Sequence, residues 1–376
     1  MSKGSRDEVV KRIHPRYLAA DKAEKGRILD EFVTTTGYHR KHAIRLLKHG
    51  PSPTQQERRG RRRTYSGETV RQLVFVWKVA GRVCGKRLQP FLPELVAALE
   101  RHDELRLEAT TRDQLLQMSA STIDRKLAPF RDSRGQTTTK PGSLLRQAIP
   151  IRTFAQWDDV VPGFLEVDLV AHCGDSTHGQ FIQTLTATDI ATGWTECLPL
   201  AHRSQENVSA AIQRLRQRLP FPLLGIDSDN DGAFINDTLC RECEASHITF
   251  TRCRPYHKND QAHVEQKNWS VVRQTIGYQR YESEAALALL DAIYADLRLY
   301  GNFFQPVMKL ISSTRHGSKV HKQYDMARTP HQRVMSAKTV QASDKLRLHQ
   351  TYLALNPVVL QARVQETLKK LWRLPR

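Results

Sequence analysis

Apolar and polar positions alternate at helical spacing through the first 50 residues. Residues 22–33 are a helix-forming run whose apolar positions are Ile28, Leu29, Phe32 and Val33. Three threonines and a glycine at 34–37 interrupt the run, and residues 38–49 resume the spacing with basic residues outside. A helix, a glycine-containing turn and a basic helix are typical of a DNA-binding helix-turn-helix. The alternative is an ordinary helical hairpin with a solvated basic face.

A second helical region is predicted over residues 67–130. Residues 68–79 and 90–102 are apolar at helical spacing. Ser119 is placed to cap a short helix at 120–127, with Arg125 and Lys126 facing outward. This segment is either a second recognition helix or a plain capped helix, and the pattern leaves both interpretations open.

The pattern changes after Trp157 to the period of strands. Residues 164–170, 181–188 and 194–198 predict an antiparallel meander, because tight connections join them. Further along, shorter apolar runs at 223–226 and 248–250 alternate with helical segments at 205–219, 231–246 and 261–275. This order predicts a mixed sheet with helices packed on it, an α/β core. Residues 284–376 are predicted to be helical and basic.

Polar, proline- and glycine-containing segments separate these regions and suggest a multidomain chain. We expect a helix-turn-helix at 1–57, a basic linker at 58–66, a second helical DNA-binding region at 67–130, a linker at 131–154, the core at 155–300 and a helical basic region at 301–376.

Charge points to a polyanionic partner. The chain carries 58 Lys and Arg against 39 Asp and Glu, a formal charge of +19. Residues 1–63 alone contain 17 basic and 7 acidic residues. Basic side chains gain affinity for duplex DNA by releasing its condensed counterions. The arginine-rich segment 58–63 is too polar to pack and is expected to be a solvated tether or a phosphate-binding arm.

The sequence gives little support for a membrane or secreted location, or for a zinc site. No stretch approaches the roughly 20 apolar residues of a membrane span, and the N-terminus lacks the apolar core of a signal peptide. A cytoplasmic, nucleoid-associated protein with reduced cysteines is therefore expected. The pair Cys240 and Cys243, followed by Cys253 and His257, allows a zinc site, but no second ligand pair stands at regular spacing.

Three acidic residues stand out because of their positions in the predicted strands and helices. Asp168 lies in the middle of the first predicted strand, where an acid is costly unless it serves a site. Asp229 follows the short strand at 223–226, and Glu265 lies on the helix at 261–275. Exactly 35 residues separate Asp229 from Glu265.

This pattern resembles the retroviral integrases and the bacterial insertion-sequence transposases that share their catalytic domain. The family signature is an Asp on the first strand, an Asp-Asn-Gly-like turn after the fourth and a Glu 35 residues later on a helix. Asp168, Asp229 and Glu265 match it, as do Pro255-Tyr256 before the Glu helix and Asn268 three residues after Glu265. The resemblance covers 155–300 closely, and the N-terminal helices and Arg328-Thr-Pro330 more loosely.

The resemblance implies a ribonuclease-H-like fold, DNA end cleavage and strand transfer, and a homo-oligomer that holds DNA ends and target. One departure matters. The turn reads Asp229-Asn230-Asp231-Gly232 with Asp227 nearby, so Asp227 and Asp231 remain alternatives to Asp229 as the second ligand.

The implied chemistry suits these residue types. Two divalent cations can activate the attacking oxygen and stabilise the leaving oxygen of an in-line displacement. Carboxylates are hard oxygen ligands for Mg²⁺, with Mn²⁺ as an expected substitute. Asp168 would bridge both ions, and Asp229 and Glu265 would each complete one.

Double-stranded DNA is the expected partner. The basic residues proposed to contact it are Arg40, Lys41, Arg45, Arg61, Arg62, Arg63, Arg125, Lys126, Lys258 and Lys267. Lys267 is two positions past Glu265, so on a helix it should point away from the metals, where it is either a contact for flanking DNA or a solvated surface residue. Two other functions stay open: a non-catalytic DNA-binding regulator derived from a transposase, and a ribonuclease-H-like nuclease that cuts without joining.

Overall fold

The computed structural model describes residues 3–50, 65–131, 161–228, 234, 237–252, 262–317 and 319–375. Its chain divides into two compact units, Met1–Thr64 and Tyr65–Arg376. None of the helices in these described parts combines the length and apolar character that crossing a bilayer requires.

The first unit is a bundle of three helices, α1 (Lys3–Ala19), α2 (Lys22–Thr36) and α3 (Arg40–His49). The side chain of Asp21 caps α2 by accepting the Glu24 N–H at 2.8 Å. Gly37 ends α2 in the left-handed region at φ 71°, which glycine adopts without strain. The three helices bury a small core that consists of Val10, Ala20, Ile28, Leu29, Phe32, Ala43 and Leu47. Both helices expected at 22–49 are therefore present.

The second unit begins with four helices, α4 (Gly67–Val79), α5 (Gly85–Arg101), α6 (Ala109–Leu116) and α7 (Ala120–Leu127). Ser119 caps α7 through the Thr122 N–H. Helices α5 and α7 touch at Gly85, where a Cβ would lie 2.2 Å from the Ala120 carbonyl oxygen. Only glycine allows this approach, and Asp124 accepts the Gly85 N–H at 2.8 Å.

A five-stranded mixed sheet follows, with the order β3-β2-β1-β4-β5. Its strands are β1 (Phe164–Ala171), β2 (Gln183–Asp189), β3 (Thr195–Leu200), β4 (Gly225–Ser228) and β5 (Thr249–Arg252). The first three strands pair antiparallel, whereas β1–β4 and β4–β5 pair parallel. The predicted meander and mixed sheet are thus confirmed.

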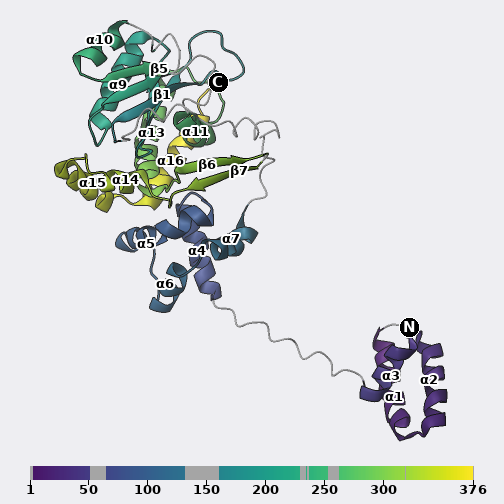
Figure 1. Cartoon of the computed structure of the whole chain (residues 1–376). Helices are drawn as coiled ribbons and strands as arrows, with labels where there is room; N and C mark the ends of the chain where they lie inside the picture. The colour runs from purple at the N-terminus through teal and green to yellow at the C-terminus, as the bar shows by residue number, and fades with distance from the viewer. Residues whose placement is uncertain are drawn as a thin grey trace. The chain divides into compact units, whose positions relative to one another are not determined.

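Helices cover both faces of the sheet (Figure 1). They are α9 (Gln205–Arg218), α10 (Asp237–Ala245), α11 (Ala262–Lys267), a π-helical turn (Asn268–Arg273), α12 (Gln274–Ile276) and α13 (Glu284–Phe304). Successive side chains of β1 point to opposite faces of the sheet. Leu165 and Val167 join a core cluster with α9 residues such as Ile212. Val170 points to the opposite face and packs with Val272 and Tyr294.

The C-terminal region contains β6 (Leu310–His316), β7 (Lys319–Tyr324), α14 (Pro330–Ser336), α15 (Ala342–Ala354) and α16 (Pro357–Trp372). The hairpin β6–β7 corrects the expectation of a wholly helical region. Its residues are almost all exposed, so no buried face imposes an alternating apolar pattern that sequence analysis could detect. Gly317 turns the hairpin at φ 62°.

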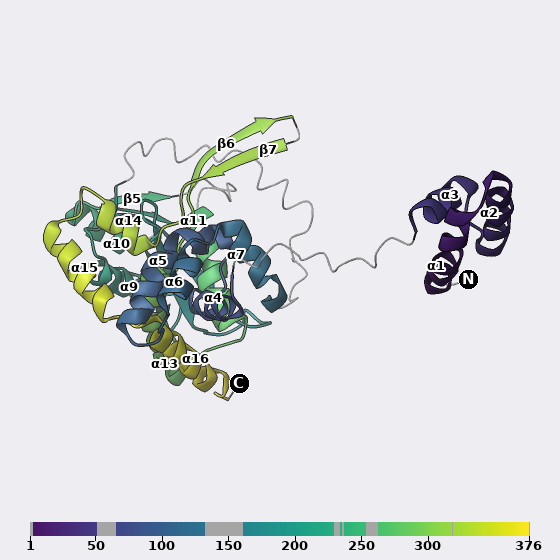
Figure 2. The same ribbon diagram turned by 90° about the horizontal axis from the view of Figure 1, so that it is seen from below.

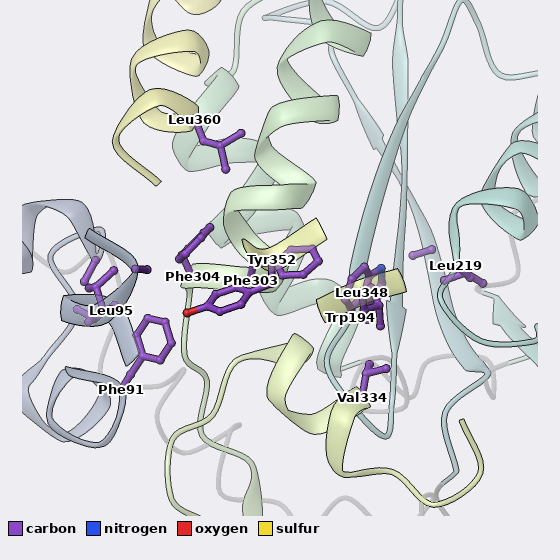
Figure 3. Close-up of a cluster of buried hydrophobic side chains, with 14 of the residues drawn as sticks. Phe91, Leu95, Trp194, Leu219, Phe303, Phe304, Val334, Leu348, Tyr352 and Leu360 are labelled. Atoms are coloured by element: carbon purple, nitrogen blue, oxygen red, sulfur yellow. The ribbon is translucent and has the colours of Figure 1, made fainter. Parts of the chain in front are cut away.

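The helices α4–α7 pack on the C-terminal elements, although they precede the sheet in sequence. Figure 3 shows Phe91 and Leu95 of α5 facing Phe304 of α13, with Leu360 of α16 on the other side of Phe304. Burying each such side chain contributes about 1.5–3 kcal/mol. Polar contacts add to this interface, because the Tyr300 hydroxyl donates to the Val79 carbonyl at 2.8 Å and Arg87 Nε donates to the Pro306 carbonyl at 2.6 Å.

Candidate functional site

Acidic side chains gather on one face of the sheet, at β1 and β4. Glu166 and Asp168 are two residues apart on β1 and therefore point to the same side. Glu166 pairs in register with Asp227 of the parallel strand β4, which places Asp227 on that side too. Glu166 is fully buried, and Asp168 is half-buried.

Helix α11 and the π-helical turn lie on this acidic face. The backbone N–H of Val264 donates to Glu166 Oε2 at 2.9 Å, so the first turn of α11 is tied to β1. Asn268 Nδ2 donates to Asp168 Oδ2 at 2.5 Å. These two contacts fix the helix that carries Glu265 against the strand that carries Asp168.

Glu265 shares a helical face with the residue that contacts Asp168. It precedes Asn268 by three positions, and residues three apart are neighbours on a helix surface. Its side chain is exposed, whereas the adjacent Val264 is fully buried. Glu265 is therefore exposed on the side of the helix that also carries Asn268.

Asp168 is held in place by two donors. Besides Asn268, its own neighbour Leu169 donates a backbone N–H to Oδ1 at 2.7 Å. These two hydrogen bonds fix the orientation of the carboxylate. The buried Glu166 and the Asn268 contact were not part of the sequence-based site. The two-residue spacing from Asp168 could have revealed Glu166, because strand residues alternate between faces.

The second acid of the signature follows β4 in the sequence. Asp229 and Lys258, as well as Asp231, fall outside the described residues. Asp227 is described and accepts a hydrogen bond from the Thr251 hydroxyl at 2.7 Å across the parallel pair β4–β5. The last residue pair of β1 and β4 is Val167 with Ser228, the residues immediately before Asp168 and Asp229.

Within the described ranges, no group of three or more His, Cys, Asp and Glu side chains is arranged to hold a metal ion. Of the residues considered for zinc, Cys243 is described and is buried in the hydrophobic core. Cys253 and His257 lie outside the described residues.

Lys267 occupies a different environment from the one expected. It lines a small, partly open cavity together with Cys197 of β3 and Tyr294 of α13. Burial, reinforced by the charge of Arg87, lowers the pKa of Lys267 to about 8. Its side chain remains partly exposed, and its contact with flanking DNA stays a prediction. Residues two positions apart on a helix point to nearly opposite sides, so Lys267 turns toward β3 and α13.

The remaining basic residues lie on helical surfaces. Arg40, Lys41 and Arg45 are exposed on α3, and Arg40 forms an ion pair with Asp30 of α2. On α7, Arg125 is exposed and Lys126 is half-buried. The three arginines at 61–63 lie outside the described residues.

Comparison with solved structures finds the catalytic core domain of BIV integrase, which is 17% identical and covers 45% of this chain and 91% of that chain with a TM-score of 0.29. A likeness of this degree does not establish a function. No protein-family model matches the chain.

A relative in sequence is much more similar. The uncharacterized protein y4rM of Sinorhizobium fredii (strain NBRC 101917 / NGR234) is 47% identical over 327 residues, which cover 86% of this chain and 93% of the relative. The chain belongs to the same protein family as y4rM.

Proposed function

We propose that the chain is a DNA transposase or integrase that cleaves DNA ends and joins them to target DNA. The observation that carries the proposal is the hydrogen bond between Asn268 and Asp168. It brings the first acid of the signature together with the helix that bears the third, Glu265, two elements almost 100 residues apart in sequence.

The donor chemistry on this face fits divalent cations. Asp168 and Glu265 offer carboxylate oxygens, the ligand type that Mg²⁺ prefers. Asp229 would add a third carboxylate, because the residue before it pairs with the residue before Asp168. Two Mg²⁺ ions about 3.5–4 Å apart, or Mn²⁺ in their place, would activate the attacking oxygen and stabilise the leaving oxygen of a phosphodiester.

The neighbouring side chains would orient this carboxylate set. Asn268 holds Oδ2 of Asp168 and the Leu169 N–H holds Oδ1, so the carboxylate cannot rotate freely. Glu166 holds the first turn of α11 and thereby positions Glu265. Such preorganisation matters because catalytic groups misplaced by about 1 Å lose most of their effect.

Substrate binding would rest on other residues. A formal charge of +19 favours association with duplex DNA through counterion release. The exposed basic residues of α3 are the best placed candidates in the first unit, with α2–α3 acting as a helix-turn-helix. Assembly as a homo-oligomer on DNA would hold two ends together.

The test is a cleavage and strand-transfer assay with the full chain, Mg²⁺ and the DNA that flanks its own gene. Asp168→Asn should abolish both 3′-end cleavage and joining, and Glu265→Gln should do the same, while duplex binding stays within about twofold. The matched control is Asp175→Asn, an exposed acid on the loop after β1, which should keep wild-type activity.

Three variants identify the second acid. Asp229→Asn should be inactive, whereas Asp227→Asn and Asp231→Asn should retain activity. If Asp231→Asn is the inactive one, the turn is registered two residues later. Near-normal strand transfer by Asp168→Asn would overturn the site. Wild-type protein that binds DNA without cutting it would favour a regulator, and cleavage without joining would favour a nuclease.

A further inference from the structure

The β6–β7 hairpin is an arm that projects from the second unit (Figure 2). All seven residues of β6 are exposed, as are five of the six residues of β7. A two-stranded hairpin is at best marginally stable in water when neither face is covered. An arm exposed on both faces therefore calls for an explanation in terms of a partner.

Charge along the arm has one sign. Residues 310–324 contain Arg315, Lys319 and Lys322, two histidines and no acidic residue. Residues directly opposite each other in an antiparallel pair project to the same side. Arg315 lies opposite Val320 and Ser313 opposite Lys322, so Arg315 and Lys322 share one face. Lys319 lies opposite His316 on the other face, and both sides of the arm thus present cations.

The root of the arm is fixed to the catalytic sheet. Lys309 Nζ donates to the carbonyls of Ile190 and Ala191 in the β2–β3 turn, at 2.6 and 2.7 Å. Asp325 accepts the Lys309 N–H at 2.6 Å and pairs with Arg333 of α14 at 2.7 Å. The arm therefore presents its charges at a defined position relative to the sheet.

We propose that the β6–β7 arm binds double-stranded DNA, inserting along a groove with its basic residues on the phosphates. This inference rests on the proposed function and names an element through which the second unit would hold its substrate. The major groove of B-DNA admits a two-stranded β-ribbon. Cations on both faces match a groove, because phosphates line both of its walls. The large exposed apolar residues of the arm, Leu310, Ile311 and Tyr324, lie at its root rather than toward its Gly317 turn.

The experiment compares two triple variants of the full chain in binding to a 30-base-pair duplex of arbitrary sequence, with chelator and no divalent ion. The arm variant is Arg315→Gln, Lys319→Gln and Lys322→Gln. The control removes three exposed charges from the C-terminal helical part of the same unit, with Lys338→Gln, Arg347→Gln and Lys369→Gln.

Affinity is measured across a series of salt concentrations. Each lost phosphate contact lowers the slope of log affinity against log salt by about 0.9, so the arm variant should lose about 2–3 from the slope. Its affinity at about 100 mM salt should fall roughly tenfold or more. The control should change the slope by less than about 1. A second arm variant, with Arg315→Lys, Lys319→Arg and Lys322→Arg, should retain wild-type affinity, because the positive charges are kept.

The outcomes separate the two hypotheses. Equal slopes and affinities for the arm and control variants would overturn the DNA-binding arm, while wild-type cleavage would still support the proposed function. A wild-type chain that fails to bind the duplex would overturn both. The arm variant could instead keep the wild-type salt slope and lose self-association in light scattering. That result would show that the arm contacts a second copy of the chain, and it would also overturn the inference.

Discussion

Arg298 on α13 neutralises a carboxylate buried in the sheet, and its removal should destabilise the second unit strongly. Its Nε contacts both carboxylate oxygens of Glu196 on β3, at 3.0 and 2.7 Å. Glu196 is 1% exposed in its side chain, and its other donor is the Trp194 indole at 2.8 Å. Arg298→Met keeps the apolar stem but leaves a buried charge with one donor.

Removing one partner of a buried ion pair costs about 3–5 kcal/mol. For a domain of this size each kcal/mol lowers the melting temperature by about 2–4 °C, so a loss of roughly 6–20 °C is expected. Circular dichroism during heating measures it. The control is Arg214→Met, whose partner Asp291 is 39% exposed, because a surface pair contributes about 0–1 kcal/mol. Equal melting temperatures for the two variants would refute the reasoning.

Two further predictions concern pH and DNA binding. Burial lowers the pKa of His331 to about 4, so between pH 6.5 and 4 the unfolded chain binds a proton that the folded chain does not. As the pH decreases across this window, the free energy of unfolding should fall by about 1.4 kcal/mol per pH unit. His331→Phe should remove the part of the loss that is due to His331. Thermal melts of both proteins at pH 7 and pH 5 would measure the difference. Identical pH dependence in both proteins would contradict the assignment. Deleting residues 1–63 should leave the second unit folded, since it has its own core, but should weaken duplex binding and flatten its salt dependence. Unchanged salt dependence would mean that DNA is bound by the second unit alone.

Local patterns accounted for most elements but not for their assembly. Runs of strand-forming residues bounded by turns predicted β1 to β3, which are mostly buried on both faces. Helical spacing predicted α2, α3, α9 and α13, because each of these helices buries apolar residues on one side. The β6–β7 hairpin gave no such signal, since nearly all of its side chains are exposed.

The acidic site shows the same division. Asp168 could be singled out because a carboxylate in an apolar strand is costly without a role. Its contact with Asn268 depends on how α11 packs on β1, which no local pattern encodes. The inward position of Lys267 likewise depends on which side of that helix the sheet covers.

By itself, the sequence determined the basic charge, the order of most helices and strands, and the three acids Asp168, Asp229 and Glu265 as candidates. Those properties follow from residue type and short-range periodicity. Only the tertiary structure decided that Glu166, Asp168 and Asp227 share a face, that α11 is tied to it, and that α4–α7 join the core of the second unit. These three features depend on strand register and on how the helices pack. Register and packing are in turn set by burial and hydrogen bonding between segments that are distant in sequence.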